Sequence, residues 1–140
     1  MLSGTLALAF AAAFTGAAFY VNWVEQPARL KLEDEALLGE WGPSDSRGVA
    51  LLLAFALIAA VAGLVSYFET QDPRWASGAV AIILSWPYAF FVMSPLDNQI
   101  RSLRGPDIAA ARALVRQWGL VETGLTGLGL VAVALFVWVI

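Results

Sequence analysis

The residue most able to carry chemistry is Glu122, a glutamate inside the otherwise uncharged apolar segment 118–140. A carboxylate at the centre of a membrane helix costs about 3 kcal/mol, so its presence there needs a reason. One interpretation is that the side chain reaches the membrane surface or pairs with an arginine such as Arg116. The other is that Glu122 lines a polar cavity and accepts a proton. At helical spacing it lies near Trp118 and Thr126.

Two further clusters of polar residues end apolar stretches. In YVNWVEQPARL, Asn22 and Glu25 are three residues apart, share a helix face, and precede Pro27, which is expected to end the helix. Glu25 is either a second candidate base or a solvated helix-end residue. In WPYAFFVMSPLDNQ, Pro87 is expected to kink a helix directly before Tyr88. Pro95 is expected to end that helix, and Asp97 and Asn98 then cap the emerging loop or point back towards the bundle.

The absence of two residue types narrows the chemistry. The chain has no cysteine and no histidine. Thiolate nucleophiles, iron–sulfur clusters and Cys-ligated zinc are therefore excluded, and the usual base near neutral pH and the commonest transition-metal ligand are missing. Acid–base chemistry must rest on carboxylates, tyrosines or Lys31, the single lysine. We expect no metal and no cofactor.

The elements that position these residues are membrane helices. Of the 140 residues, 60% are hydrophobic and 14% are charged, and the mean hydropathy is +0.74. A helix needs about 20 apolar residues to cross a bilayer, and segments 2–24, 48–68, 75–96 and 118–140 meet that requirement. The sequence therefore predicts one all-α membrane domain, a four-transmembrane-helix bundle. The net charge of −3 argues against nucleic acid, and the expected partner is the lipid bilayer.

The connections between these helices predict the topology. Segment 69–74 is a tight turn, whereas 25–47 and 97–117 are longer and must lie together at the other end of the bundle. The first long connection is expected to hold a short surface helix over 30–41, and the last helix is expected to begin near Pro106. The long connections hold seven of the eight basic residues: Arg29, Lys31, Arg47, Arg101, Arg104, Arg112 and Arg116. We expect a multi-pass protein of the cell (inner) membrane, and the positive-inside rule then predicts that both long loops are cytoplasmic and both termini outside.

The ordered stretches FTGAAFYVNWVEQPARL, EWGPSDSRG, WPYAFFVMSPLDNQIRSL and LVRQWGLVETGLTGLGL resemble the anthrone oxygenase-like membrane proteins over essentially the whole chain. The resemblance implies a four-helix membrane protein. It also implies an activity of some members, the oxidation of polycyclic anthrones to anthraquinones by molecular oxygen without a metal or flavin. The family pattern falls here on Asn22, Glu25, Pro27, Trp41, Pro87, Tyr88, Pro95, Asn98 and Trp118. Members typically carry histidine or asparagine where this chain has Glu122, and arginine where it has Leu125.

Two hypotheses for function follow. The first is an enzyme acting on a hydrophobic aromatic or quinol-like small molecule that enters from the bilayer. In it Glu122 or Glu25 removes a proton, and the resulting anion reacts with oxygen. Tyr88, Asn22 and Asn98 donate hydrogen bonds to the developing oxyanion, and Trp41 and Trp118 contact the substrate.

The second hypothesis is a non-catalytic accessory or assembly subunit that packs against partner membrane proteins in a larger complex. A channel or carrier is less favoured, because one intramembrane carboxylate gives a poor ion path.

The enzyme hypothesis requires Glu122, Asn22, Glu25, Tyr88 and Asn98 to surround one space near the cytoplasmic membrane boundary.

Overall fold

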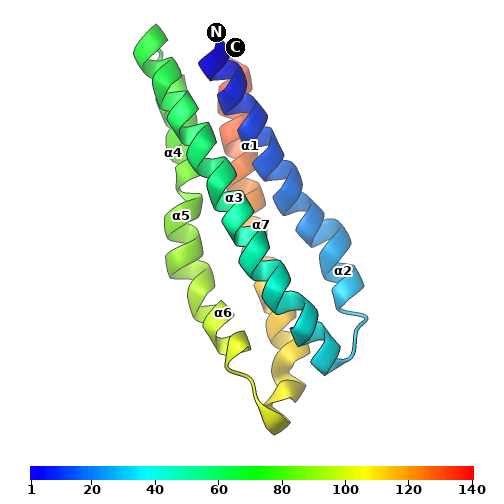
Figure 1. The fold of residues 1–140 in the computed structure, drawn as a ribbon. Helices are drawn as coiled ribbons and strands as arrows, with labels where there is room; N and C mark the ends of the chain where they lie inside the picture. Colours follow the sequence, from blue (N-terminus) through cyan, green and yellow to red (C-terminus); the bar gives the residue numbers. More distant parts are fainter.

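The computed structural model describes all 140 residues as an antiparallel bundle of four long helical segments, without strands (Figure 1). The segments run continuously over Leu2–Arg29, Asp34–Thr70, Pro73–Arg101 and Gly105–Val139. Each is long and apolar enough to cross a membrane, and each contains one of the four apolar stretches found in the sequence. The all-helical fold expected from the sequence is thus confirmed, and the protein is a multi-pass membrane protein.

Three of the four segments change helix type along their length. The first consists of α1 (Leu2–Tyr20), a π-helical stretch (Val21–Glu25) and α2 (Gln26–Arg29). The second is α3 alone (Asp34–Thr70). The third consists of α4 (Pro73–Ile83), α5 (Ser85–Pro87), a second π-helical stretch (Tyr88–Met93) and α6 (Ser94–Arg101). The fourth starts as a 3-10 helix (Gly105–Ala110) and continues as α7 (Ala111–Val139).

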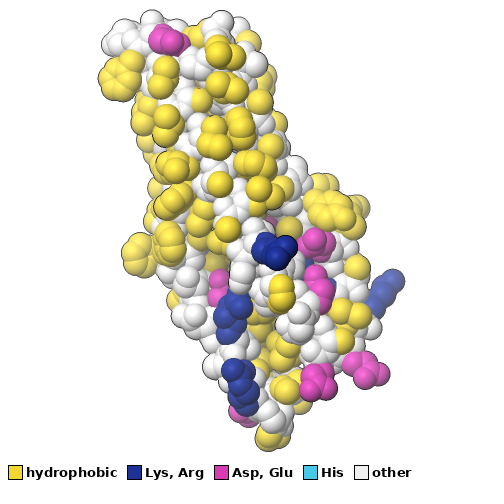
Figure 2. Space-filling view, in the orientation of Figure 1, with side chains coloured by type: hydrophobic (Ala, Val, Ile, Leu, Met, Phe, Trp, Pro, Cys, Tyr) yellow, Lys and Arg dark blue, Asp and Glu magenta, His cyan; other side chains and the backbone are white.

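The two ends of the bundle differ in their polar content. Both termini lie at one end with the short turn between α3 and α4, and the two longer connections lie at the other end (Figure 1). Charged side chains gather towards the end with the longer connections, whereas the rest of the visible face is mostly apolar (Figure 2). Phe91, in the π-helical stretch of the third segment, is 80% exposed, as expected for a side chain that contacts lipid.

The turn at the terminal end is closed by a capping residue. The Asp72 carboxylate accepts a hydrogen bond from the Arg74 backbone N–H at 3.0 Å and pairs with its guanidinium at 2.6 Å. These hydrogen bonds lower the pKa of the Asp72 carboxyl below its ordinary value. Gln71 adopts a left-handed conformation directly after α3, with φ of 59°, and so reverses the chain.

Three sequence expectations about helix ends are wrong. The short surface helix over 30–41 is not separate but forms the first turns of α3, which continues through Pro43. Pro43 cannot donate to the Gly39 carbonyl, but both residues are exposed, so water can replace the lost bond. Pro27 and Pro95 do not end their helices either. Each follows a π-helical stretch, whose wider turn accommodates a residue without an amide proton.

Small residues let the helices approach closely. α1 packs against α3 and α7, and α4 packs against the same two helices. Ala7, Ala11, Ala56 and Ala132 are fully buried at these contacts. A Cβ added to Gly63 would lie only 3.1 Å from the ring of Phe136, so the absence of a side chain at Gly63 makes room for that ring. Close packing of this kind is the main attraction between helices in lipid.

Candidate functional site

Glu122 is buried in the bundle, with only 2% of its surface exposed. The Asn22 side-chain amide donates a hydrogen bond to its Oε2 atom, and Oε1 is buried without a hydrogen-bond partner. Arg116 is exposed and makes no ion pair with Glu122. The carboxylate therefore does not reach the membrane surface and keeps one oxygen free inside the protein.

The two π-helical stretches both contact α7 at this level. Asn22 belongs to the first stretch, and Tyr88 begins the second. The Tyr88 hydroxyl donates a hydrogen bond to the Val121 carbonyl, directly before Glu122. π-Helical turns inside α-helices are frequently found at functional sites. Here two of them place polar side chains against consecutive residues of α7.

Glu25 is held by Arg29, a residue that our sequence analysis did not include among the site residues. Arg29 is 2% exposed and forms ion pairs with Glu25 at 2.8 Å and with Glu40 at 3.1 Å. Its guanidinium also donates to the Ser44 hydroxyl at 3.0 Å and lies 5.4 Å from the Trp118 ring centroid. The spacing of Glu25 and Arg29, one helical turn apart, was the signal available in the sequence. Glu25 is thus an ion-pair partner rather than a free carboxylate.

A second unpredicted residue, Gln26, joins the first helical segment to the last. It is buried, and its Nε2 donates to the Val115 carbonyl at 2.7 Å. Its side chain fills the space beside Gly119, where an added Cβ would lie 3.0 Å from the Gln26 Cδ atom. Gly119 therefore allows the close approach of the two helices one turn before Glu122.

Trp41 and Trp118 lie together below Glu122, towards the charged end. Their ring centroids are 5.9 Å apart with the rings nearly perpendicular. The Arg101 guanidinium covers Trp41 at 4.9 Å from the ring centroid. Both indole N–H groups are buried without a hydrogen-bond partner. Trp118, but not Trp41, lines the small cavity described below.

Asn98 does not join this group. It is exposed on α6, whereas the adjacent Asp97 buries its Oδ1 atom without a hydrogen-bond partner. Asp45 on α3, which the sequence analysis also missed, is 5% exposed and pairs with Arg101 at 2.7 Å. Asn22 and Tyr88 thus contact α7 at Glu122 and directly before it, whereas Asn98 lies outside this group.

A cavity of about 20 Å³, room for one water molecule, lies next to Glu122. A groove of about 390 Å³ lies between α1 and α3, and the exposed residues Tyr20 and Arg47 are on its border. The cavity and the groove have four lining residues in common: Val21, Ser44, Gly48 and Leu52. The groove on the side of the bundle thus lies next to the cavity at Glu122 and shares part of its wall.

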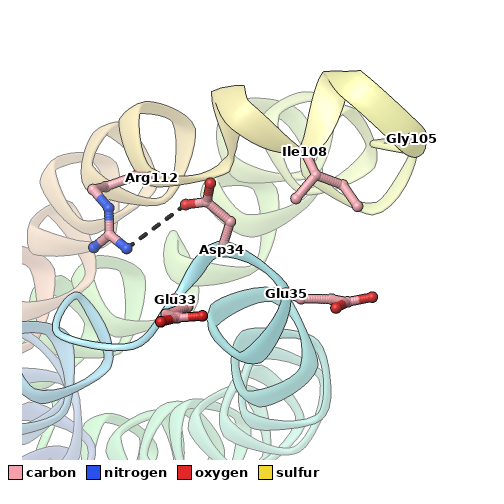
Figure 3. A pocket seen from close by; sticks show the side chains of 6 residues that line it. All are labelled: Glu33, Asp34, Glu35, Gly105, Ile108 and Arg112. Carbon is pink, nitrogen blue, oxygen red and sulfur yellow. Dashed lines mark ion pairs between the residues drawn. The ribbon is translucent and has the colours of Figure 1, made fainter.

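A larger open depression of about 610 Å³ lies at the charged end, between the start of α3 and the 3-10 helix (Figure 3). Glu33, Asp34 and Glu35 line it together with Arg112, whose Nη2 atom is 3.7 Å from Asp34. Arg112 also donates to the Leu30 carbonyl and, at 2.5 Å, to the Leu32 carbonyl. Arg112 thereby fastens the first long connection to α7. None of the lining residues borders the Glu122 cavity.

No group of three or more acidic side chains is arranged to hold a metal ion. In a comparison with protein families, a family model described as anthrone oxygenase matches residues 41–135. That range includes Trp41, Tyr88, Trp118 and Glu122, whereas Asn22 and Arg29 precede it. No curated protein and no solved structure matches the chain significantly.

Proposed function

The chain belongs to the anthrone oxygenase family, and from that premise we propose that it oxidises a hydrophobic aromatic substrate of the anthrone or quinol type within the membrane. The observation that carries this proposal is the environment of Glu122. A buried carboxylate with one free oxygen lies beside a small cavity, and a lateral groove on the bundle surface shares four lining residues with that cavity. A purely structural carboxylate would have both oxygens bonded or exposed to water.

Glu122 is the general base in this proposal. Its Oε1 atom removes a proton from the acidic methylene carbon of an anthrone, while Asn22 holds Oε2 in place. The carbanion that forms is electron-rich and reduces molecular oxygen. In the complete reaction the methylene carbon gains one oxygen atom as a ketone. The second oxygen atom leaves as water with the two methylene hydrogens, so one molecule of oxygen is used per product.

Tyr88 has a positioning role rather than a role at the reacting atoms. Its hydroxyl already donates a hydrogen bond to the Val121 carbonyl, so the phenol fixes the backbone directly before Glu122. The exposed Asn98 has no part in the site, and Glu25 neutralises Arg29. Of the carboxylates first considered, Glu122 is therefore the base that we propose.

The groove between α1 and α3 supplies the access path. Its volume of about 390 Å³ is within the range of roughly 300–1,000 Å³ typical of ligand pockets. Ala17, Val21, Leu51 and Leu52 form its apolar wall, and Glu25, Ser44 and Arg47 line its polar part. An apolar tricyclic molecule dissolved in the bilayer can reach such a groove without crossing water.

The test uses the purified protein in lipid nanodiscs with anthrone as substrate. Oxygen uptake and anthraquinone formation are measured together, and empty nanodiscs give the rate of spontaneous oxidation. We expect a protein-dependent rate with one oxygen consumed per anthraquinone formed. A rate no higher than that of empty nanodiscs, together with stoichiometric co-purifying membrane subunits, would instead support the accessory role.

A further inference from the structure

Three buried polar atoms without a hydrogen-bond partner belong to residues around one cavity. They are Glu122 Oε1, Asp45 Oδ1 and the indole nitrogen of Trp118. Each of these residues is at most 5% exposed, and all three line the cavity of about 20 Å³. Buried polar atoms in native proteins are almost always bonded to protein or to ordered water. Because no protein group bonds these three atoms, we expect their partner to lie in the cavity that the residues share.

The size of the cavity restricts what this partner is. A volume of about 20 Å³ holds one water molecule and excludes an aromatic ring. Ser44 is the other lining residue with a polar side chain, and its hydroxyl is already bonded to Arg29 at 3.0 Å and to Glu25 at 3.3 Å. The partner is therefore a single small molecule that has to satisfy two carboxyl groups and one indole.

The hydrogen-bonding capacities of the three groups match those of water. An indole N–H only donates, and an ionised carboxylate only accepts. The other oxygen of Asp45 pairs with Arg101 at 2.7 Å, which leaves Oδ1 as an acceptor. One water molecule that accepts a bond from Trp118 and donates to Glu122 and Asp45 satisfies all three atoms at once. Molecular oxygen cannot donate to a carboxylate, and a metal cation would face the positive end of the indole N–H.

We propose that this cavity binds one water molecule, held by Trp118, Asp45 and Glu122, through which Glu122 takes up the proton of the substrate. The groove between α1 and α3 shares part of its wall with the cavity, and Gly48 adds no side chain to that wall. A general base can act through one intervening water.

The water explains how a buried base serves a substrate that is too large for the cavity. The C–H bond of the substrate breaks and its electron pair stays on the carbon. The water accepts that proton, and one of its own protons passes to Glu122 Oε1. Asp45 and Trp118 are positioning residues in this step, because they hold the water and not the substrate. The transfer step rests on the proposed function, whereas the water site itself does not.

A crystal structure of the wild-type protein in a lipidic mesophase, at a resolution that shows ordered water, tests the site without substrate. We expect one peak of density in the cavity, within about 3.2 Å of Glu122 Oε1, Asp45 Oδ1 and Trp118 Nε1. Absence of the peak, or a peak that leaves any of the three atoms unbonded, would overturn the site. Crystals grown with rubidium in place of sodium exclude a cation, since a strong anomalous peak in the cavity would overturn it as well.

The transfer step is tested by solvent isotope effects on anthrone oxidation in nanodiscs. Two protons move when the water is the carrier, so kcat should fall in D₂O and depend on the deuterium fraction along a curve. Glycerol at the viscosity of D₂O is the control. A kcat that is equal in H₂O and D₂O would refute transfer through the water. If the wild-type protein does not oxidise anthrone at all, the proposed function fails, while the crystal structure still decides whether the water is bound.

Trp118→Phe tests the positioning role, because it keeps an aromatic ring and removes the N–H that holds the water. We expect kcat to fall roughly tenfold, the equivalent of one hydrogen bond, with an unchanged KM. Trp75→Phe, at an equally buried residue of α4 near the terminal end, is the control and should leave both constants unchanged. Thermal unfolding checks that both variants are folded. An unchanged kcat in a folded Trp118→Phe protein would contradict the role, and if that variant does not fold, the isotope effect on the wild-type protein decides.

Discussion

The Asn22 side-chain amide donates a hydrogen bond to the Glu122 carboxylate, which lies 100 residues later in the chain. This contact joins the first helical segment to the last at the point where a π-helical stretch widens the first. It leaves Glu122 Oε1 without a partner and directs a free carboxylate oxygen into the protein interior. A hydrogen bond to a charged group contributes about 1.5–3 kcal/mol.

Replacing Asn22 should therefore impair the base without removing it. We expect Asn22→Leu to lower kcat for anthrone oxidation by roughly 10- to 100-fold, the equivalent of one charge-assisted hydrogen bond. Steady-state kinetics in nanodiscs measure this. Asn98→Leu is the matched control, because Asn98 is exposed and outside the site. Equal losses in the two variants would contradict the role given to Asn22.

The access path predicts a change in substrate affinity. Gly48 lines both the cavity and the groove, and a Cβ added to it meets no atom within 4 Å. Gly48→Leu should fold normally, fill the opening and raise KM by roughly tenfold or more, with little change in kcat. Gly127→Leu, at an exposed position that also has open space, is the control. An unchanged KM in Gly48→Leu would show that substrate arrives by another route.

A pair of glycines in α7 tests the position of Tyr88. A Cβ on Gly124 would overlap the Tyr88 phenol, whereas a Cβ on Gly127 would meet nothing within 4 Å. Gly124→Ala should displace the phenol and lower the free energy of unfolding by about 1–3 kcal/mol. Gly127→Ala should be neutral or slightly stabilising, because alanine favours helix. Thermal unfolding in detergent compares them, and equal stability of the two variants would place Tyr88 elsewhere.

The asymmetry of basic residues still predicts the orientation. With both long connections in the cytoplasm and both termini outside, alkaline phosphatase fused after Ile140 should be active, and a fusion after Arg104 should be inactive. Arg74 is the one basic residue at the terminal end. Activity in the Arg104 fusion together with inactivity in the Ile140 fusion would reverse the topology.

The four helices could be recognised from the sequence because uncharged runs of membrane length admit few other structures. Glu122 was recognisable because an ionisable residue inside a membrane-spanning segment is energetically costly. The course of α3 through Pro43 and of the first segment through Pro27 could not be foreseen. Proline disfavours helix locally, and its tolerance here depends on exposed carbonyls and on π-helical turns that form only in the folded bundle.

Which residues near the charged end face the interior of the bundle could not be predicted from the sequence either. A shift of one position rotates a helical side chain by about 100°, so the choice between Asp97 and Asn98 depended on packing. Arg29 and Asp45 lie in a stretch that reads as a polar loop, where a charged residue gives no sign of burial. Both became buried because α3 begins earlier than its apolar residues suggest.

The central claim is that Glu122 is the base for oxidation of an anthrone-type substrate, and Glu122→Gln tests it most directly. The amide keeps the shape of the side chain but cannot accept the proton. The measurement is the oxygen-dependent rate of anthraquinone formation by wild-type and variant protein in nanodiscs, with thermal unfolding of both recorded in parallel. Our account predicts a variant rate equal to that of empty nanodiscs, with the fold retained. A folded Glu122→Gln protein that oxidises anthrone at the wild-type rate would contradict it.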